Sequence, residues 1–273
     1  MTAIRFVDIV FVYHLRDERQ IAWHGRRHSH GSELHELHYF ISGAGSFRNG
    51  PGTWTITPGS LHLTPPGTEH QIVATDIRRP ITYYAVLFDA SGDDELYKLL
   101  SRLGPDAGPS EIGTSRRFFF ADILERHFSA REDLVRAAQH NFIAFLYDLV
   151  AGSAARGAVD NAHVEKALAI MQLSIEKGLS LADICERLQL TREHFVRVFS
   201  ERMGMPPMKY YSRLKIEAGR AMLSSTNLRI QEIADKLGFA NQFNFTRTFK
   251  RLANMSPTEY RARCLQRADF TAE

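Results

Sequence analysis

Cysteine is nearly absent from this 273-residue chain, and so are long apolar runs. Cys185 and Cys264 are the only two cysteines, and they lie too far apart for the paired spacing of a zinc site or a disulfide framework. A helix that crosses a bilayer needs about 20 consecutive apolar residues, and no such run is present. We therefore expect a globular protein of the reducing cytoplasm that does not enter a membrane.

Positive and negative residues are nearly equal in number, with a formal net charge of +3, but they are unevenly distributed along the chain. Residues 161–270 carry 18 Lys and Arg against 11 Asp and Glu, whereas residues 1–160 carry 16 against 19. Eight of the 12 histidines lie in the first 70 residues. This asymmetry indicates two modules with different partners, and the second partner is expected to be a polyanion such as double-stranded DNA.

The local pattern divides the chain into three segments. Residues 1–100 alternate aromatic and β-branched residues between Gly and Pro turns, as in LHYFISGAGSFRNG, which predicts an antiparallel β barrel or sandwich. Residues 101–152 form a connector that becomes helical from Arg116 onward. After the small-residue stretch AGSAARGAVDNA, which has the composition of a linker, residues 161–268 are helical throughout.

The connector helix expected near residues 129–150 has a wide apolar face. Ser129 and Glu132 stand at the spacing of a capping box at its start. Its apolar face comprises Leu134, Ala138, Asn141, Phe142, Phe145, Leu146 and Leu149. This face is expected either to pack against its own barrel or to pair with a second copy, which would make the protein a homodimer.

The last hundred residues contain an internal repeat. Five positions match at an offset of 49: Leu181, Ile184, Cys185, Leu188 and Leu190 with Ile230, Ile233, Ala234, Leu237 and Phe239. Five more match at an offset of 50: Phe195, Arg197, Phe199, Pro207 and Tyr210 with Phe245, Arg247, Phe249, Pro257 and Tyr260. Each copy reads as a short helix, a tight turn and a second helix, with a small residue where the two helices cross.

Helical geometry indicates which side chains of the second helices are free. The inward stripes consist of Phe195 and Phe199 in one copy and of Phe245 and Phe249 in the other. Arg197 and Arg247 then point outward at equivalent positions, beside an outward Phe243. An arginine fork can pair with the acceptors of a guanine edge in the major groove. The repeated placement and the local basic surplus therefore predict DNA contact.

The stretch IADKLGFANQFNFTRTFKRLANMSPTEYR resembles the signature of AraC/XylS-type bacterial transcription regulators, and the resemblance extends over about residues 161–265. It implies two helix-turn-helix units joined by a long helix within Pro207–Ser224. By position, base readout is expected from Arg192, Glu193, Val196, Arg197, Gln242, Phe243, Asn244 and Arg247. Phosphate contacts are expected from Lys209, Arg213, Lys250 and Arg251.

The histidine-rich N-terminal part resembles the cupin barrels. GSLHLTPPGTEH is similar to their second motif, and His28-x-His30 followed by Glu36 is similar to their first. The resemblance implies that His28, His30, Glu36 and His70 meet as a set suited to iron, manganese or zinc. The expected fold is α+β and multidomain: a cupin-like antiparallel barrel, a helical connector, and an all-α domain with two helix-turn-helix units.

Two functions of different class remain open for the barrel. In the first, it senses a small molecule, expected to be a sugar or related metabolite, through Arg26, His28, His30, Glu36, Trp54 and His70, without a required cofactor. In the second, it is a metal-dependent enzyme with a DNA-binding tail. The AraC-type resemblance favours the sensor, whose effector alters dimer geometry and DNA binding, with RNA polymerase as a further partner if it activates transcription. His24, His35, His38 and His62 are expected to be ordinary surface or wall residues.

Overall fold

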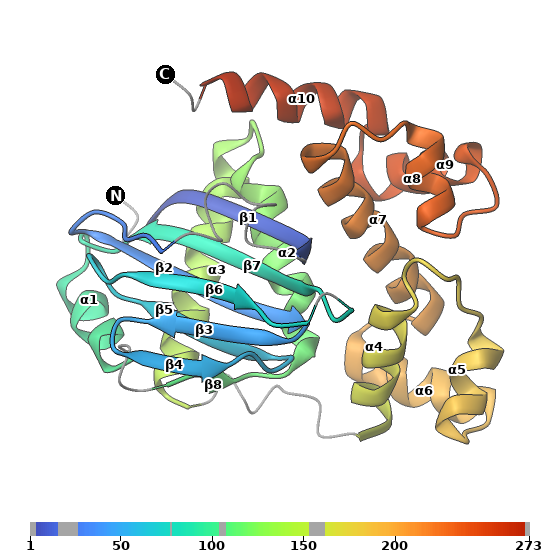
Figure 1. Cartoon of the computed structure of the whole chain (residues 1–273), viewed down its shortest axis with the longest axis horizontal. Helices are drawn as coiled ribbons and strands as arrows, with labels where there is room; N and C mark the ends of the chain where they lie inside the picture. Colours follow the sequence, from blue (N-terminus) through green and yellow to red (C-terminus); the bar gives the residue numbers. More distant parts are fainter. Residues whose placement is uncertain (1–3, 16–26, 77, 104–107, 153–161, 271–273) are drawn as a thin grey trace. The chain divides into compact units, whose positions relative to one another are not determined.

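The computed structural model describes residues 4–15, 27–76, 78–103, 108–152 and 162–270 (Figure 1). The chain divides between Val159 and Asp160 into two compact units. The first unit contains all the strands of the described residues, and the second is helical. No helix among the described residues is both long enough and apolar enough to cross a membrane.

The first unit contains two antiparallel sheets, which confirms the expected antiparallel β region. The five-stranded sheet has the order β1 (Arg5–Leu15), β7 (Ile81–Asp89), β2 (Leu34–Ser42), β5 (Ser60–Thr64) and β8 (Ser110–Glu111). The three-stranded sheet has the order β4 (Gly52–Thr55), β3 (Gly45–Asn49) and β6 (His70–Ala74). The cupin-like strands are thus arranged as a larger and a smaller sheet.

The two faces of β2 carry different chemistry because side chains alternate along a strand. Tyr39 faces the helical layer, where its ring stacks on Phe120 at 4.6 Å between centroids. Phe40 faces the smaller sheet and contacts Phe47 of β3 at 5.7 Å. The same alternation brings Glu36 and His38 to the face that carries Phe40, so polar groups enter the space between the sheets.

The outer face of the larger sheet is covered by α2 (Arg117–His127) and α3 (Glu132–Val150), while α1 (Asp94–Leu100) follows β7. Phe142 of α3 contacts Phe6 at 5.3 Å and Phe88 at 5.1 Å. The apolar face of α3 therefore packs on its own sheet.

Two expectations about α3 were wrong. Asn141 is exposed, because Phe142 takes the inward position beside Ala138 and Phe145. The capping box does not form: α3 begins at Glu132, and the Ser129 hydroxyl instead accepts a hydrogen bond from the Arg131 amide at 3.2 Å.

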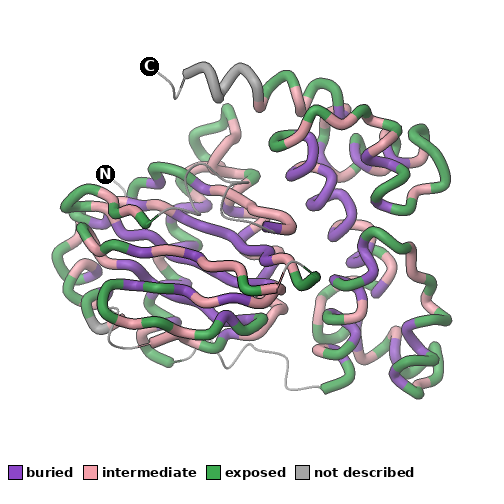
Figure 2. The backbone as a smooth tube through the Cα atoms, in the orientation of Figure 1, coloured by how far each residue is buried: buried purple, intermediate pink, exposed green. Residues whose placement is uncertain are grey.

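The second unit consists of seven helices within residues 162–270. They are α4 (Ala162–Leu173), α5 (Leu181–Leu188), α6 (Arg192–Met203), α7 (Pro207–Ser225), α8 (Ile230–Lys236), α9 (Gln242–Ala253) and α10 (Pro257–Phe270). Helix α5 starts with a capping box between Ser180 and Asp183. Helix α7 carries buried residues along most of its length (Figure 2), as expected for the helix that joins two helix-turn-helix units.

Both helix-turn-helix units turn through a left-handed residue. Gly238 has a φ of +61°, and Gln189 adopts nearly the same value, +56°, at the equivalent place. Glycine adopts this conformation without strain, whereas a residue with a Cβ does not. The first turn thus forms with a residue that has a Cβ where the second turn has glycine.

Candidate functional site

The second helices of the two helix-turn-helix units, α6 and α9, start in the same way. The Thr191 hydroxyl accepts a hydrogen bond from the His194 amide at 3.3 Å, and the Asn241 side chain accepts one from the Asn244 amide at 2.9 Å. Each cap lies directly before the first expected base-contacting residue. Capping therefore fixes the helix ends that a recognition helix presents to base edges.

The buried side of both helices is the expected one. Phe195 and Phe199 have rings 5.5 Å apart, and Phe245 and Phe249 have rings 5.6 Å apart; all four are at most 1% exposed. The opposite side carries the expected base-contacting residues. Arg192, Glu193, Arg197, Gln242, Phe243 and Arg247 are exposed, while Val196 and Asn244 are half-buried.

The two outward arginines have different surroundings. Arg197 lies 3.3 Å from the Glu201 carboxylate and 3.3 Å from His194 Nδ1. Arg247 lies over the Phe243 ring, with 6.0 Å from the guanidinium carbon to the ring centroid. Phe243 is itself 70% exposed. A phenylalanine ring exposed to this extent keeps apolar area in water that contact with a partner would remove.

The four residues expected to contact phosphates lie at two places in the second unit. Lys250 and Arg251 are exposed in the last turn of α9. Lys209 is exposed in the first turn of α7, and Arg213, one turn later, is half-buried.

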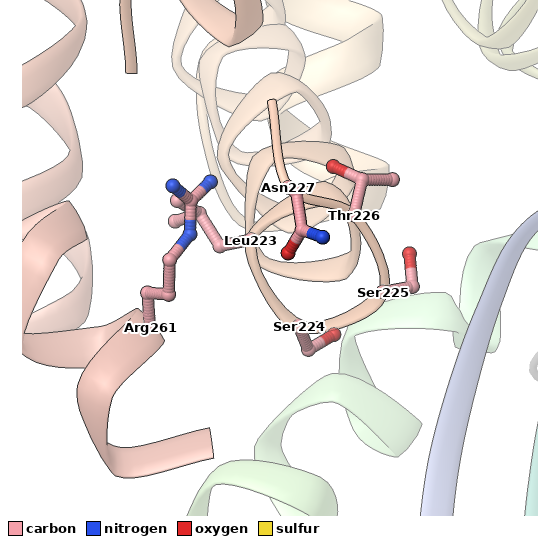
Figure 3. A pocket seen from close by; sticks show the side chains of 6 residues that line it. All are labelled: Leu223, Ser224, Ser225, Thr226, Asn227 and Arg261. Atoms are coloured by element: carbon pink, nitrogen blue, oxygen red, sulfur yellow. The ribbon is translucent and has the colours of Figure 1, made fainter. Parts of the chain in front are cut away.

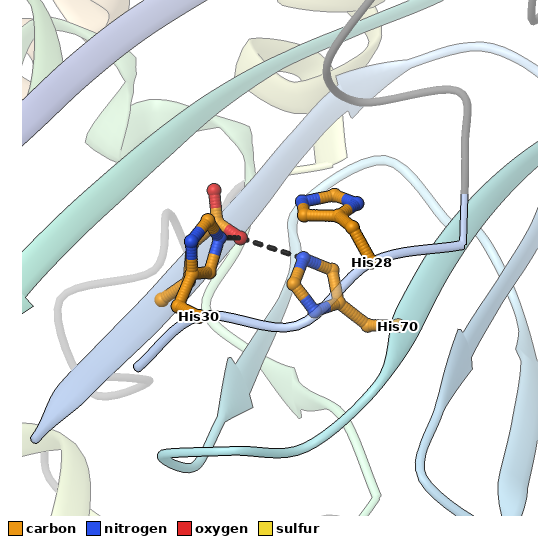
Figure 4. A group of neighbouring side chains, drawn as sticks. His28, His30 and His70 are labelled. Carbon is orange, nitrogen blue, oxygen red and sulfur yellow. Dashed lines mark hydrogen bonds and ion pairs between the residues drawn. The ribbon is translucent and has the colours of Figure 1, made fainter. Parts of the chain in front are cut away.

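The first unit brings together the four residues expected to bind a metal (Figure 4). Glu36 lies on β2, His70 begins β6, and His28 and His30 lie on the segment before β2. His28 and His70 also exchange backbone hydrogen bonds of 3.2 and 2.9 Å, which hold that segment against β6. The cluster therefore joins three separate segments of the chain.

The Glu36 carboxylate is the centre of this cluster. Its Oε2 lies 2.6 Å from His70 Nε2 and 2.9 Å from His30 Nε2. One donor atom from each of His28, His30, Glu36 and His70 lies within 4.8 Å of all the others. Three imidazole nitrogens and one carboxylate oxygen form a donor set that suits zinc, iron or manganese. The residues therefore fit a divalent metal by donor type and by proximity.

Electrostatics keep Glu36 ionised although it is 2% exposed. Burial alone would raise the pKa of Glu36, but the imidazoles of His38, His30 and His70 outweigh burial and hold its pKa well below the usual value. An ionised carboxylate among imidazoles is ready to bind a cation or a polar ligand.

His38 is the residue of this site that was not expected from the motifs. It is fully buried, and its Nε2 lies 3.7 Å from Glu36 Oε1. His35, His38 and His62 were expected to be ordinary surface or wall residues, and none of the three lies on the surface, because all are at most 3% exposed. The signal that could have found His38 is strand alternation, which places it on the same face as Glu36.

The structure describes one of the two remaining expected effector contacts, Trp54 of β4. Trp54 fills space beside glycine: a Cβ on Gly52 would meet its ring, and one on Gly108 would lie 3.2 Å from its Nε1. Its ring is also 6.0 Å from that of His62. Arg26 lies outside the described residues, as does His24.

Similarity to known proteins agrees with both units. Residues 184–263 match a helix-turn-helix domain, and residues 12–116 match an AraC-like ligand binding domain. The raffinose operon transcriptional regulatory protein RafR of Pediococcus pentosaceus is 25% identical over 82% of this chain and 83% of its own length. The transcriptional activator AarP of Providencia stuartii is 34% identical over 36% of this chain and 73% of its own length.

A solved transcriptional regulator from Chromobacterium violaceum, with an AraC-type DNA-binding domain, is 31% identical. The match covers 38% of this chain and 93% of the solved chain, with a TM-score of 0.37. The chain belongs to the AraC/XylS family of transcription regulators, with an effector-binding unit followed by a DNA-binding unit of two helix-turn-helix motifs.

Proposed function

We propose that α6 and α9 each read one half of a two-part DNA site, and that a ligand at the Glu36 cluster controls this binding. The observation that carries the DNA-reading part of this proposal is that Arg197 and Arg247 are both exposed at equivalent positions. Base contacts are assigned to Arg192, Glu193, Val196, Arg197, Gln242, Phe243, Asn244 and Arg247. Phosphate contacts are assigned to Lys209, Arg213, Lys250 and Arg251.

The two kinds of contact respond differently to DNA sequence and salt. Lys250→Ala should weaken binding to selected and unrelated DNA alike and lower the salt dependence of log K by about 0.9. Gln242→Ala should weaken binding to the selected sequence only. Fluorescence anisotropy of the full chain on both DNAs at several salt concentrations measures this. Equal losses on both DNAs for Gln242→Ala would contradict its assignment to base readout.

The Glu36 cluster is proposed to hold one divalent metal through His28, His30, Glu36 and His70. A bound ion would offer a Lewis-acid site to oxygen atoms of a small molecule. His38 beside Glu36 would keep the carboxylate oriented, as outer groups do for metal ligands. The family consists of transcription regulators, so we assign the centre to sensing and not to turnover of a substrate.

The proposed effector is a sugar or a related polyhydroxylated metabolite. The similarity to RafR, which is named for a raffinose operon, supports this class. Neighbouring hydroxyl groups can bind a metal ion and can also donate hydrogen bonds to a buried carboxylate such as Glu36. Effector binding would act on DNA affinity only through unequal affinity for two arrangements of the protein.

Metal binding is tested on protein purified without chelators. Elemental analysis should find about one zinc, iron or manganese per chain, and EDTA should lower the melting temperature of the first unit. Glu36→Gln should abolish metal binding, whereas the control Glu33→Gln, at an exposed carboxylate three residues earlier, should keep it. A metal content near zero for every ion, with no shift on adding zinc, would rule out the centre. Sugars that are recovered chemically changed would favour the enzyme alternative.

We also propose that the protein acts in the cytoplasm as a homodimer, and that it contacts RNA polymerase if it activates transcription. The inner face of α3 is covered by its own sheet, so a dimer through this helix would use the outer face with Arg136, His140, Ala144 and Tyr147, which are exposed. Phe145 is 4% exposed, and Phe145→Asp would unfold the unit before it tested association. Tyr147→Asp should give monomers in sedimentation, and a monomeric wild type would end the dimer proposal.

A further inference from the structure

A buried lysine lies in the middle of α7. Lys215 is 9% exposed, and its amine donates a hydrogen bond to the carbonyl oxygen of Gly238 at 3.1 Å. The rings of Tyr211 and Phe239 flank the amine at 5.1 and 5.0 Å. Burying an ammonium group is costly unless specific partners compensate for lost water. Gly238 and Phe239 form the turn of the second helix-turn-helix unit, so Lys215 binds α7 to that turn.

One turn earlier, α7 is bound to the first helix-turn-helix unit. The Tyr211 hydroxyl donates a hydrogen bond to the carbonyl oxygen of Ser174 at 2.6 Å. Ser174 directly follows α4, which packs against α5 and α6. Tyr211 and Lys215 are four residues apart and therefore adjacent on the helix surface. Tyr211 thus contacts the first helix-turn-helix unit, and its neighbour Lys215 contacts the second.

The two helix-turn-helix units also approach each other beside Lys215. A Cβ on Gly238 would lie 3.1 Å from the amide nitrogen of Gly178 and 3.6 Å from Lys215 Nζ. Gly178 lies in the loop between α4 and α5. We define Tyr211, Lys215, Gly178, Gly238 and Phe239 as the Lys215 junction. At this junction the linking helix, the loop before α5 and the turn before α9 meet.

The contacts at the far end of α7 are of another kind (Figure 3). Arg261 of α10 lines a pocket with the residues that end α7, Leu223 to Asn227. Its guanidinium donates a hydrogen bond to the carbonyl oxygen of Leu228, in the loop before α8. The hydroxyls of Ser225 and Thr226 donate to α7 carbonyls and close the helix end. These contacts close the end of α7 and tie α10 to the loop between α7 and the second helix-turn-helix unit. Both helix-turn-helix units meet α7 at the Lys215 junction.

We propose that Lys215 is a positioning residue that sets the angle and spacing between α6 and α9, and hence the half-site spacing that the protein accepts. This inference rests on the proposal that the two helices read two half-sites. Successive major-groove segments on one face of DNA are about 34 Å apart. Two recognition helices fit both segments only when their separation is held fixed, so a loosened junction should broaden the accepted spacing.

The first test measures distance and needs no DNA. Spin labels are placed at Glu193→Cys and Lys250→Cys of the full chain, after Cys185→Ala, which copies Ala234 of the repeat, and Cys264→Ser. Pulsed electron paramagnetic resonance should show one narrow distance distribution, and Lys215→Met should broaden it. Lys236→Met, at an exposed lysine of α8, should leave it narrow. An unchanged width in Lys215→Met would overturn the proposal.

Tyr211→Phe tests the same junction if Lys215→Met fails to fold. It removes the bond to Ser174 and keeps the ring, and it should also broaden the distribution; an unchanged width in this variant would equally overturn the proposal.

The second test measures spacing on DNA selected by the wild type. Lys215→Met should bind the best spacing about two- to tenfold more weakly, as expected for a lost buried hydrogen bond, and bind sites with one or two inserted base pairs with a smaller penalty than the wild type. Equal spacing penalties in variant and wild type would contradict the proposal. A broadened distribution in a protein that selects no two-part site would instead remove the two-half-site proposal and leave the mechanical role of Lys215 standing.

Discussion

Arg197 of α6 and Arg247 of α9 stand at equivalent positions, each midway between two buried phenylalanines and each exposed on the opposite side of its helix. The inward rings fix the rotation of each helix about its axis, because a turn of the helix would expose them to water. The same outward face is therefore offered twice in one unit. This relationship is what makes the pair suitable for reading two stretches of one duplex.

Glu201 should limit DNA binding by Arg197. Its carboxylate lies 3.3 Å from the Arg197 guanidinium, so Arg197 must leave it to reach a base, and the carboxylate also repels phosphate. Glu201→Gln should increase affinity for the selected site several-fold at low salt and less at high salt. Anisotropy titrations at two salt concentrations measure this, with Glu186→Gln, at an exposed position of α5, as the control. Unchanged or weaker binding at low salt would contradict the prediction.

Gly238 and Gln189 should respond in opposite directions to substitution, because both have a left-handed φ. Gly238→Ala adds a Cβ 3.1 Å from the Gly178 amide and should cost about 1 kcal/mol or more. Gln189→Gly removes left-handed strain of about 1–2 kcal/mol and adds backbone entropy to the unfolded chain, so stability should rise slightly. Calorimetry of the full chain measures both. A stabilised Gly238→Ala would show that the turn is not constrained as described.

His62 should make the first unit sensitive to acid. Burial lowers the pKa of His62 from 6.5 to about 4, so the unfolded chain binds a proton before the folded one does. Its contribution to stability is full above pH 6.5 and is lost as pH falls toward 4, by about 3 kcal/mol at most. His62→Phe should reduce this loss in denaturation followed by tryptophan fluorescence, since both tryptophans precede residue 55. Identical pH profiles for variant and wild type would contradict the assignment.

Glu217 should destabilise α7 as pH rises. Burial raises the pKa of Glu217 well above its usual value, although Arg220 lowers it in part. The folded state therefore holds a proton that the unfolded state releases, and stability falls as pH rises from about 4.5 toward the raised pKa. Glu217→Gln should slow amide hydrogen exchange in α7 relative to the wild type at pH 7 and have less effect at pH 5. The same ratio at both pH values would contradict this prediction.

The sequence predicted the DNA-binding unit in more detail than the sensor unit. The repeat placed Phe195, Phe199, Phe245 and Phe249 inside, because a helical period over two copies leaves few alternative rotations. In the first unit, the alternation of strands predicted the antiparallel sheets, but not how they divide into two. That division depends on contacts between residues that are distant in the sequence, such as His38 and His70, whose rings lie 5.3 Å apart, and local patterns do not encode such contacts.

The sensor site shows the same limit. The motifs selected His28, His30, Glu36 and His70, which do converge. They missed His38, because a motif names ligands and not the buried groups beside them. Trp54 was assigned to the effector because its ring can stack on a ligand, and this assignment stays a prediction. The structure uses this ring to fill the space that Gly52 and Gly108 leave.

The most direct measurement is base preference in the two arginine variants. DNA sites are selected from a random pool by the full-length wild type, by Arg197→Ala and by Arg247→Ala, and then sequenced. Each variant should lose preference at one position, worth about 1–3 kcal/mol, and the two positions should lie about one helical turn apart. If both variants select the wild-type sequence with unchanged preference at every position, α6 and α9 are not the elements that read the DNA.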